Sequence, residues 1–370
     1  MNGALLLSPV FDRISRGRAV MCAVVAWLSS GIFCAAWADV RLLSITNFDS
    51  FSRVLANSEG LVLVSPELQP GFRWKELIVS WNAATNVSLS VEARPVISGG
   101  ATFLSLGRWT SVPGPENPRE SVNGQKEPWG EVQTDVMILK DSATAAQVRL
   151  GIRGPVAGLR RLSLAFSGPG PHPARASVPS VPSARGMDLP VPIRSQADYP
   201  EGVSKWCSPT STSMLMAFWG ERMGRSEWIL PVPDVAKGVM DPGWGGTGNW
   251  PFNMALPGSR TGLNAAVARW NGIQDLERWV AAGMPAAASV SYALLKGRPS
   301  VEAGDGHLVV VRGFTPDGDV IVNDPGVRQE KVRRVFPRSD FERAWDHSGR
   351  TVYLVWPDGH ALPEGAGYPR

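Results

Sequence analysis

Three residue types that together support nucleophilic attack on a carbonyl occur in the C-terminal half of the chain: a cysteine, a histidine and an aspartate. Cys207 stands before a predicted helix, whose positive end would lower the pKa of the thiol. That helix is expected to start near Ser208, with Pro209 in its first position, and to end at Gly220. The hydroxyls that follow the cysteine could cap its first turn. This position predicts a reactive thiol, with an inert, buried cysteine as the alternative.

A nucleophilic cysteine needs a base, normally a histidine whose second ring nitrogen is held by a carboxylate or an amide. The chain contains four histidines. His172 lies in a Pro-rich segment, His347 in a charged segment expected to be exposed, and His360 in a polar tail. His307 instead precedes the most apolar strand of this half, residues 308–311. The sequence therefore predicts His307 as the base.

Asp324 ends the second strand of a predicted β-hairpin, and His307 stands at the head of the first. A tight turn at residues 315–318 would bring these two ends together. Asn323 is the rival for orienting the imidazole, but neighbouring residues of a strand face opposite sides, so only one can serve. The other interpretation of Asp324-Pro325 is an ordinary turn at the end of a strand.

Gln196 precedes Cys207 by eleven residues and carries a side-chain amide. That amide could donate to a developing oxyanion, together with the backbone N–H of Cys207. Taken alone the signal is weak, because a surface glutamine in a loop is far commoner than a catalytic one.

The first 38 residues have the pattern of a secretory signal peptide. A basic stretch ends at Arg18, an uncharged apolar run covers residues 19–36, and Ala36-Trp37-Ala38 offers small residues to a signal peptidase. An uncleaved membrane anchor is the alternative. The predicted location is secreted or periplasmic, with no membrane association after the signal is removed.

Cysteine use fits this location. Cys22 and Cys34 fall within the signal, so the mature chain would keep Cys207 as its single cysteine. An unpaired cysteine is unusual in a compartment where thiols normally form disulfides, which favours a functional role.

Composition divides the rest of the chain into two modules joined by a linker. Residues 39–167 are expected to form a β-sandwich, because short β-rich runs alternate with turn residues. Residues 168–188 are rich in Pro, Ser and Gly and are expected to be an extended linker. The expected strands of the first module are 61–65, 76–81, 88–93, 102–105, 133–138, 147–152 and 162–166.

Residues 189–370 are expected to form an α+β module that begins with helices and ends in an antiparallel sheet. After the helix that follows Cys207, helices are expected at 261–270 and 273–282. Strands are expected at 286–292, 308–314, 319–323 and 351–356.

Composition also excludes some partners. The formal net charge of +4 is too small, and the basic residues are too scattered, for a nucleic-acid-binding surface. The short cluster of Lys331, Arg333 and Arg334 is interpreted as one solvated face of a strand. The sequence holds no metal-ligand cluster, phosphate-binding loop or dinucleotide motif, so no metal and no cofactor are predicted.

These motifs resemble the C39-like peptidases, the bacteriocin-processing double-glycine group of cysteine peptidases. The resemblance covers the whole second module and implies a papain-like fold with a Cys–His–Asp site, and a glutamine in the oxyanion hole. It also implies a loop near the cleft at residues 248–253. The matching residues are Gln196, Trp206-Cys207-Ser208-Pro209-Thr210-Ser211, Gly306-His307-Leu308 and Asn323-Asp324-Pro325.

The first module is similar to β-sandwich domains that precede such peptidases in secreted bacterial proteins, through residues 80–82 and 106–109. One departure from the family is Ser208, where glycine usually follows the cysteine. The expected reaction is hydrolysis of a peptide or amide bond in a peptide or protein, including cell-wall peptides. A catalytically silent wall-binding protein, with Trp244 and Trp250 as stacking residues, is the alternative, and a structural adhesin is a third.

Overall fold

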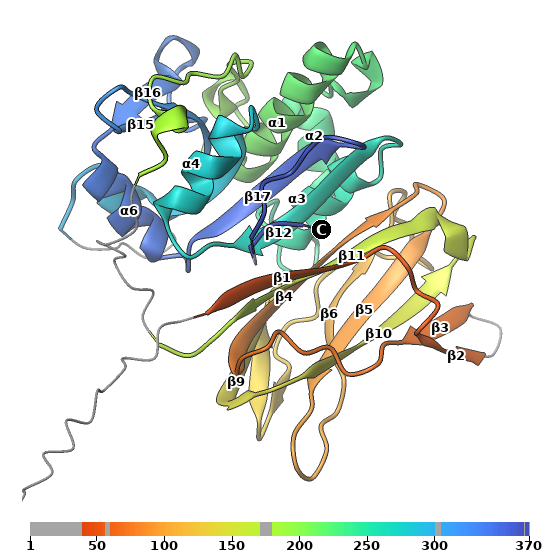
Figure 1. Ribbon diagram of the computed structural model, residues 1–370. Helices are drawn as coiled ribbons and strands as arrows, with labels where there is room; N and C mark the ends of the chain where they lie inside the picture. Colours follow the sequence, from red (N-terminus) through yellow and green to blue (C-terminus); the bar gives the residue numbers. More distant parts are fainter. Residues whose placement is uncertain (1–38, 56–59, 171–179, 300–304, 366, 370) are drawn as a thin grey trace, which may run out of the picture. The chain divides into compact units, whose positions relative to one another are not determined.

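The computed structural model describes residues 39–55, 60–170, 180–299, 305–365 and 367–369. The predicted signal peptide and the centre of the predicted linker lie outside these ranges. Among the residues described, no helix is long and apolar enough to cross a membrane. Both helices and sheets are present, which confirms the predicted α+β fold class (Figure 1).

The N-terminal module consists of two antiparallel sheets that enclose an apolar core. Strand β5 shows why these residues form strands: Leu89, Val91 and Ala93 alternate into the core with polar residues between them. The first sheet has the order β1 (Val40–Ile45), β11 (Leu159–Ser167), β4 (Trp74–Ala83), β9 (Val136–Ala143), β8 (Gly130–Gln133) and β7 (Lys126–Glu127). The second has the order β2 (Ser52–Leu55), β3 (Leu61–Val64), β10 (Ala146–Arg153), β5 (Ser88–Pro95) and β6 (Leu104–Trp109).

One predicted strand of this module is wrong. The run 133–138 is broken between β8 and β9, where Thr134 adopts a φ of 56°. A threonine in this left-handed region makes a turn, and the turn aims Asp135 away from the sheet toward the second module.

The C-terminal module is a six-stranded antiparallel sheet with the order β12 (Leu263–Arg269), β17 (Thr351–Pro357), β13 (Ala286–Ser291), β14 (Gly306–Phe314), β15 (Val320–Asn323) and β16 (Arg333–Phe336). Its helices are α1 (Cys207–Met223), α2 (Val232–Val239), α3 (Trp250–Gly258), α4 (Ile273–Ala281), α5 (Tyr292–Leu295) and α6 (Arg338–Asp346). Helix α1 packs against the sheet through Met214, Leu215, Phe218 and Trp219, which are buried.

Helix α1 begins where the sequence predicts but runs beyond Gly220. A side chain at Gly220 would collide with Ile229, because a Cβ there would lie 2.4 Å from Ile229 Cγ1. This glycine therefore permits close packing rather than ending the helix. Gly224, with a φ of 64°, ends it in the left-handed conformation.

The helix predicted at residues 261–270 is wrong, because residues 263–269 form β12. This strand lies at the edge of the sheet, and all of its residues are buried. Side chains of β4 complete its free edge: Asn82 bonds to both the N–H and the C=O of Ala265, at 3.1 and 2.7 Å, and Ser80 Oγ accepts from Val267 N at 3.1 Å. The N-terminal module thus satisfies backbone groups that a neighbouring strand would otherwise pair.

Candidate active site

Cys207 is the first residue of α1, so its backbone N–H belongs to the unpaired first turn of the helix. The side chain is partly buried. The predicted capping by the following hydroxyls is wrong, because no side chain caps this helix. Instead Ser208 Oγ bonds to Tyr353 Oη at 2.8 Å, and Ser211 Oγ donates to the carbonyl of Leu308 at 3.2 Å. These bonds hold the start of the helix against the sheet.

The β-hairpin brings His307 and Asp324 together. Val310 pairs with Asn323, so Asp324 follows one position beyond, on the face of the sheet that His307 shares with Val309. His307 Nε2 and Asp324 Oδ1 are 2.8 Å apart, and both side chains are buried. The other ring nitrogen, Nδ1, is left for the thiol of Cys207, whose interaction with the imidazole raises the pKa of His307.

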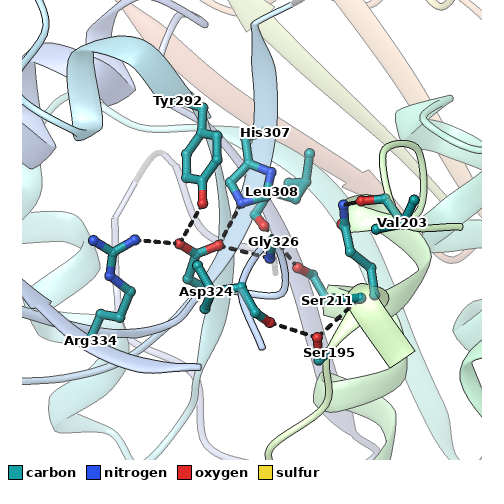
Figure 2. Close-up of polar contacts among 12 residues, drawn as sticks. Ser195, Val203, Ser211, Tyr292, His307, Leu308, Asp324, Gly326 and Arg334 are labelled. Atoms are coloured by element: carbon teal, nitrogen blue, oxygen red, sulfur yellow. Dashed lines mark hydrogen bonds and ion pairs between the residues drawn. The ribbon is translucent and has the colours of Figure 1, made fainter. Parts of the chain in front are cut away.

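Asp324, which contacts the imidazole of His307, also accepts hydrogen bonds from three other residues, as Figure 2 shows. Its Oδ2 accepts from Tyr292 Oη at 3.0 Å and from Arg334 Nη1 at 2.9 Å, and its Oδ1 accepts from the backbone N–H of Gly326 at 2.9 Å. A Cβ at Gly326 would lie 2.9 Å from His307 Cε1, so only glycine leaves room for the ring. The carboxylate is therefore fixed on both of its oxygens.

Two of these residues, Arg334 and Tyr292, are not predicted from the sequence as part of the site. The sequence predicts Arg333 and Arg334 on one solvated strand face, but Arg334 contacts Asp324, whereas Arg333 contacts Asp188. Alternation along β16 sends the two arginines to opposite sides. Tyr292 packs its ring against His307, with 4.0 Å between the ring centres. Alternation was a signal for Arg334, but no sequence signal was available for Tyr292.

Asn323, the rival orienting residue, faces the other side of the sheet. Its Oδ1 accepts from Arg312 Nη1 at 3.1 Å, and its amide nitrogen donates to the carbonyl of Val191 at 3.2 Å. These bonds join the start of the module to the hairpin and leave Asp324 alone beside the imidazole.

Charges in the site favour a thiolate–imidazolium pair. Burial opposes ionisation of Cys207, but its hydrogen bond to His307 and the charge of that imidazole lower the thiol pKa below its ordinary value. Burial also opposes a charge on His307, but Asp324 and Cys207 raise its pKa to about 9. Asp324 is buried as well, yet its bonds to His307, Gly326 and Arg334 lower its pKa to about 2. The site therefore favours negative charge on Cys207 and Asp324, with the positive charge of His307 between them.

Gln196 lies beside the turn that carries Asp324. Its backbone N–H donates to the carbonyl of Pro325 at 2.9 Å, and Ser195 Oγ donates to the carbonyl of Val327 at 2.6 Å. The side chain is buried, and its Nε2 donates to the carbonyl of Val203 at 2.7 Å. One of the two amide hydrogens is used in this bond, so the second remains available.

A cleft of about 1210 Å³ opens beside Cys207, and both modules line it. Residues 133–136 of the β8–β9 turn form one wall, and the Gly-rich loop 244–248 forms another. The buried Asp135 accepts from the backbone N–H of Trp250 at 2.6 Å, and burial raises its pKa to about 7. The prediction of a loop at residues 248–253 is wrong in part. Helix α3 starts at Trp250, and the side chain of Asn249 caps it.

The other histidines differ in position. His347 is exposed, as predicted, but it lines the same cleft as Cys207. His360 is not in a free polar tail, because its ring packs against Trp219 at 4.9 Å between ring centres. His172 lies outside the described residues.

Ser208 is expected to contribute to stability rather than to catalysis. Ser208→Ala would leave the buried hydroxyl of Tyr353 without its bond to this residue and lower the free energy of unfolding by about 1–3 kcal/mol. Urea denaturation measures this change, and alkylation of Cys207 should be unaffected. Thr210→Val is the matched control, because the buried hydroxyl of Thr210 has no hydrogen-bond partner among the residues that the structure describes, so its loss should be neutral or stabilising. Equal losses in both variants would contradict this role.

Two segments of the chain match known protein families. Residues 188–353 match the peptidase C39 like family, and residues 55–160 match the peptidase C39 N-terminal domain. Among solved structures, a candidate C39-like peptidase from Bacillus anthracis is 17% identical, covers 46% of this chain and 96% of its own, and has a TM-score of 0.35. No curated protein matches the chain. The two matched segments follow the order of the two modules, and residues 188–353 belong to the C39-like peptidase family.

Proposed function

We propose that this protein is an active cysteine peptidase or amide hydrolase, with Cys207 as nucleophile, His307 as base and Asp324 as the residue that orients the base. The observation that carries the proposal is the buried His307–Asp324 pair, 2.8 Å apart, whose imidazole also interacts with the Cys207 thiol. A buried histidine with a pKa of about 9 beside a thiol of lowered pKa favours the ion pair at neutral pH.

The proposed reaction is acyl transfer to the thiol and then to water. The Cys207 thiolate attacks the carbonyl carbon of the substrate, and the C–N bond breaks as the His307 imidazolium gives its proton to the leaving amine. Water, deprotonated by the same imidazole, then releases the acyl group. Charge on the carbonyl oxygen would be stabilised by the backbone N–H of Cys207 and the second amide hydrogen of Gln196.

We further propose that the protein works outside the cytoplasm, secreted or periplasmic, after removal of residues 1–38. Its support is the signal-like sequence and the loss of Cys22 and Cys34 with it, which leaves Cys207 with no cysteine to pair with. The proposed substrates are peptides or proteins, including cell-wall peptides. No membrane and no nucleic acid take part.

Iodoacetamide labelling of the mature protein between pH 5 and 10 tests the ion pair. Cys207 should react at pH 7 much faster than a free thiol, whose pKa of about 8.5 leaves only a few per cent as thiolate. Hydrolysis of a quenched fluorescent peptide mixture should fall as the pH rises through about 9, because deprotonated His307 cannot protonate the leaving amine.

Cys207→Ala is the control, and it should abolish both labelling and hydrolysis. Labelling of the wild-type protein no faster than that of a free thiol would sink the enzyme assignment. A silent binding protein on the peptidase scaffold would then be the better description.

A further inference from the structure

We propose that Trp244 determines substrate specificity at the Cys207 cleft, as a platform for a large apolar side chain of the peptide being cleaved. The inference rests on the proposed peptidase function and adds the class of side chain that the cleft selects. Trp244 lines the same cleft as Cys207, on the Gly-rich loop 244–248, and the β8–β9 turn lines this cleft as well.

The indole of Trp244 lies close to the backbone of its own loop but is not buried. A Cβ at Gly246 or at Gly248 would lie 2.8 or 2.7 Å from its six-membered ring, so only glycine lets the ring lie against this backbone. The residue nevertheless stays 48% exposed, while every other tryptophan in the described ranges is buried or partly buried. Covering exposed aromatic surface in a cleft with an apolar group lowers the free energy, so such a surface favours binding of an apolar group.

The loop that carries Trp244 is held in place before any substrate binds. Asp241 is fully buried and accepts from Ser121 N at 2.9 Å, from Asn249 Nδ2 at 2.9 Å and from Trp244 N at 3.3 Å. The side chain of Asn123 also donates to the carbonyl of Gly243. A platform fixed in this way loses little conformational entropy on binding, so its apolar surface contributes more fully to affinity.

The N-terminal module supplies most of this support. Arg119, which is buried, donates to the carbonyls of Lys237, Gly238 and Met240 at 2.7, 2.6 and 3.0 Å. These carbonyls end helix α2, where backbone acceptors lack partners and a cation is favoured. Residues 119–123 therefore position the loop, and the first module has a part in substrate selection.

The surroundings of the ring fit a peptide better than a sugar. Sugar binding by stacking also requires polar side chains that bond to the hydroxyls, but the loop beside the indole offers Gly245, Gly246 and Gly248, and the hydroxyl of Thr247 already donates to the carbonyl of Lys205. Gly306, which also lines the cleft, starts β14 with open space where a side chain would be. These glycines leave room in the cleft for an extended main chain.

Peptidyl vinyl sulfones test this proposal, because they alkylate Cys207 from the substrate position. The probes carry phenylalanine at each of four positions in turn in an all-alanine peptide. In the wild-type protein one position should prefer phenylalanine over alanine by about ten-fold or more in labelling rate. Trp244→Ala should abolish the preference at that position, whereas Trp244→Phe should keep most of it.

Arg119→Lys should weaken the same preference, because one ammonium group cannot reach three carbonyls. The iodoacetamide rate and the melting temperature of each variant separate this inference from the proposed function. Slow iodoacetamide labelling in the wild-type protein would count against the peptidase itself. Fast iodoacetamide labelling with a phenylalanine preference that is absent, or unchanged in a folded Trp244→Ala variant, would overturn the platform. A probe with N-acetylglucosamine that labels fastest would identify a sugar-binding site instead.

Discussion

Replacement of His307 by alanine is expected to slow iodoacetamide labelling of Cys207 at pH 7 by about 10²-fold and peptide hydrolysis by about 10³-fold or more. The reason lies in the balance that sets the thiol pKa. Burial raises it, and the hydrogen bond and charge of His307 bring it down. Without the imidazole the desolvation cost remains unopposed, so the thiol stays protonated at neutral pH and no group delivers a proton to the leaving amine.

His347→Ala is the matched control, since this histidine lines the same cleft but has no place in the thiol–imidazole–carboxylate line. It should label and hydrolyse at the wild-type rate. The assignment of the base would be contradicted if His347→Ala lost reactivity while His307→Ala kept it. Labelling rates measured across pH 5 to 10 in both variants give the thiol pKa directly.

The central residues of the site could be predicted because each follows from short-range rules. Cys207 precedes a segment of helix-forming residues, and the helix start is within one residue of the prediction. His307 and Asp324 stand at the two open ends of one hairpin, whose turn fixes which residues approach one another. Alternation along a strand then separates Asp324 from Asn323 without any knowledge of the rest of the fold. The catalytic roles themselves stay proposals until the variants are measured.

The errors arose where distant segments decide local structure. Residues 263–269 carry apolar residues at helical spacing, but they form a strand because β17 pairs with one edge and Asn82 and Ser80 complete the other. Those two side chains are more than 180 positions away in the sequence. A local pattern contains no trace of such partners, and tertiary contacts override helical preference.

The same limit applies to the cleft. Trp244 stands out in the sequence as one aromatic residue among glycines, but its support comes from residues 119–123, and residues 133–136 supply a further part of the cleft wall. Position in the sequence suggests two separate modules. The contacts of Asp135 with Trp250, and of Arg119 with the end of α2, instead make the first module part of the surface around Cys207.

Asp324→Asn is expected to reduce hydrolysis by about 10³-fold, even though an amide can orient an imidazole in principle. Asp324 accepts from His307, Tyr292, Arg334 and Gly326, and it donates to none of them. An asparagine can accept on only one atom, so its NH₂ group would face the guanidinium of Arg334, which has no acceptor. The loss of the carboxylate charge would also lower the pKa of His307 and weaken the ion pair.

A second substitution separates charge from simple damage to the fold. In Asp324→Asn with Arg334→Met, the amide no longer faces a cation, and the double variant should recover about ten-fold of the lost activity. Arg334→Met alone should reduce activity less than Asp324→Asn does, because His307 keeps its carboxylate.

The pH at which hydrolysis declines reports the pKa of the His307 imidazole. This pH should fall below about 9 in Asp324→Asn and stay near 9 in Arg334→Met. If the double variant is no more active than Asp324→Asn, the loss in Asp324→Asn does not come from the NH₂ group that faces Arg334. Full activity of Asp324→Asn would remove Asp324 from the catalytic line, because neither the charge nor the acceptor set of the aspartate would then be needed to hold the base.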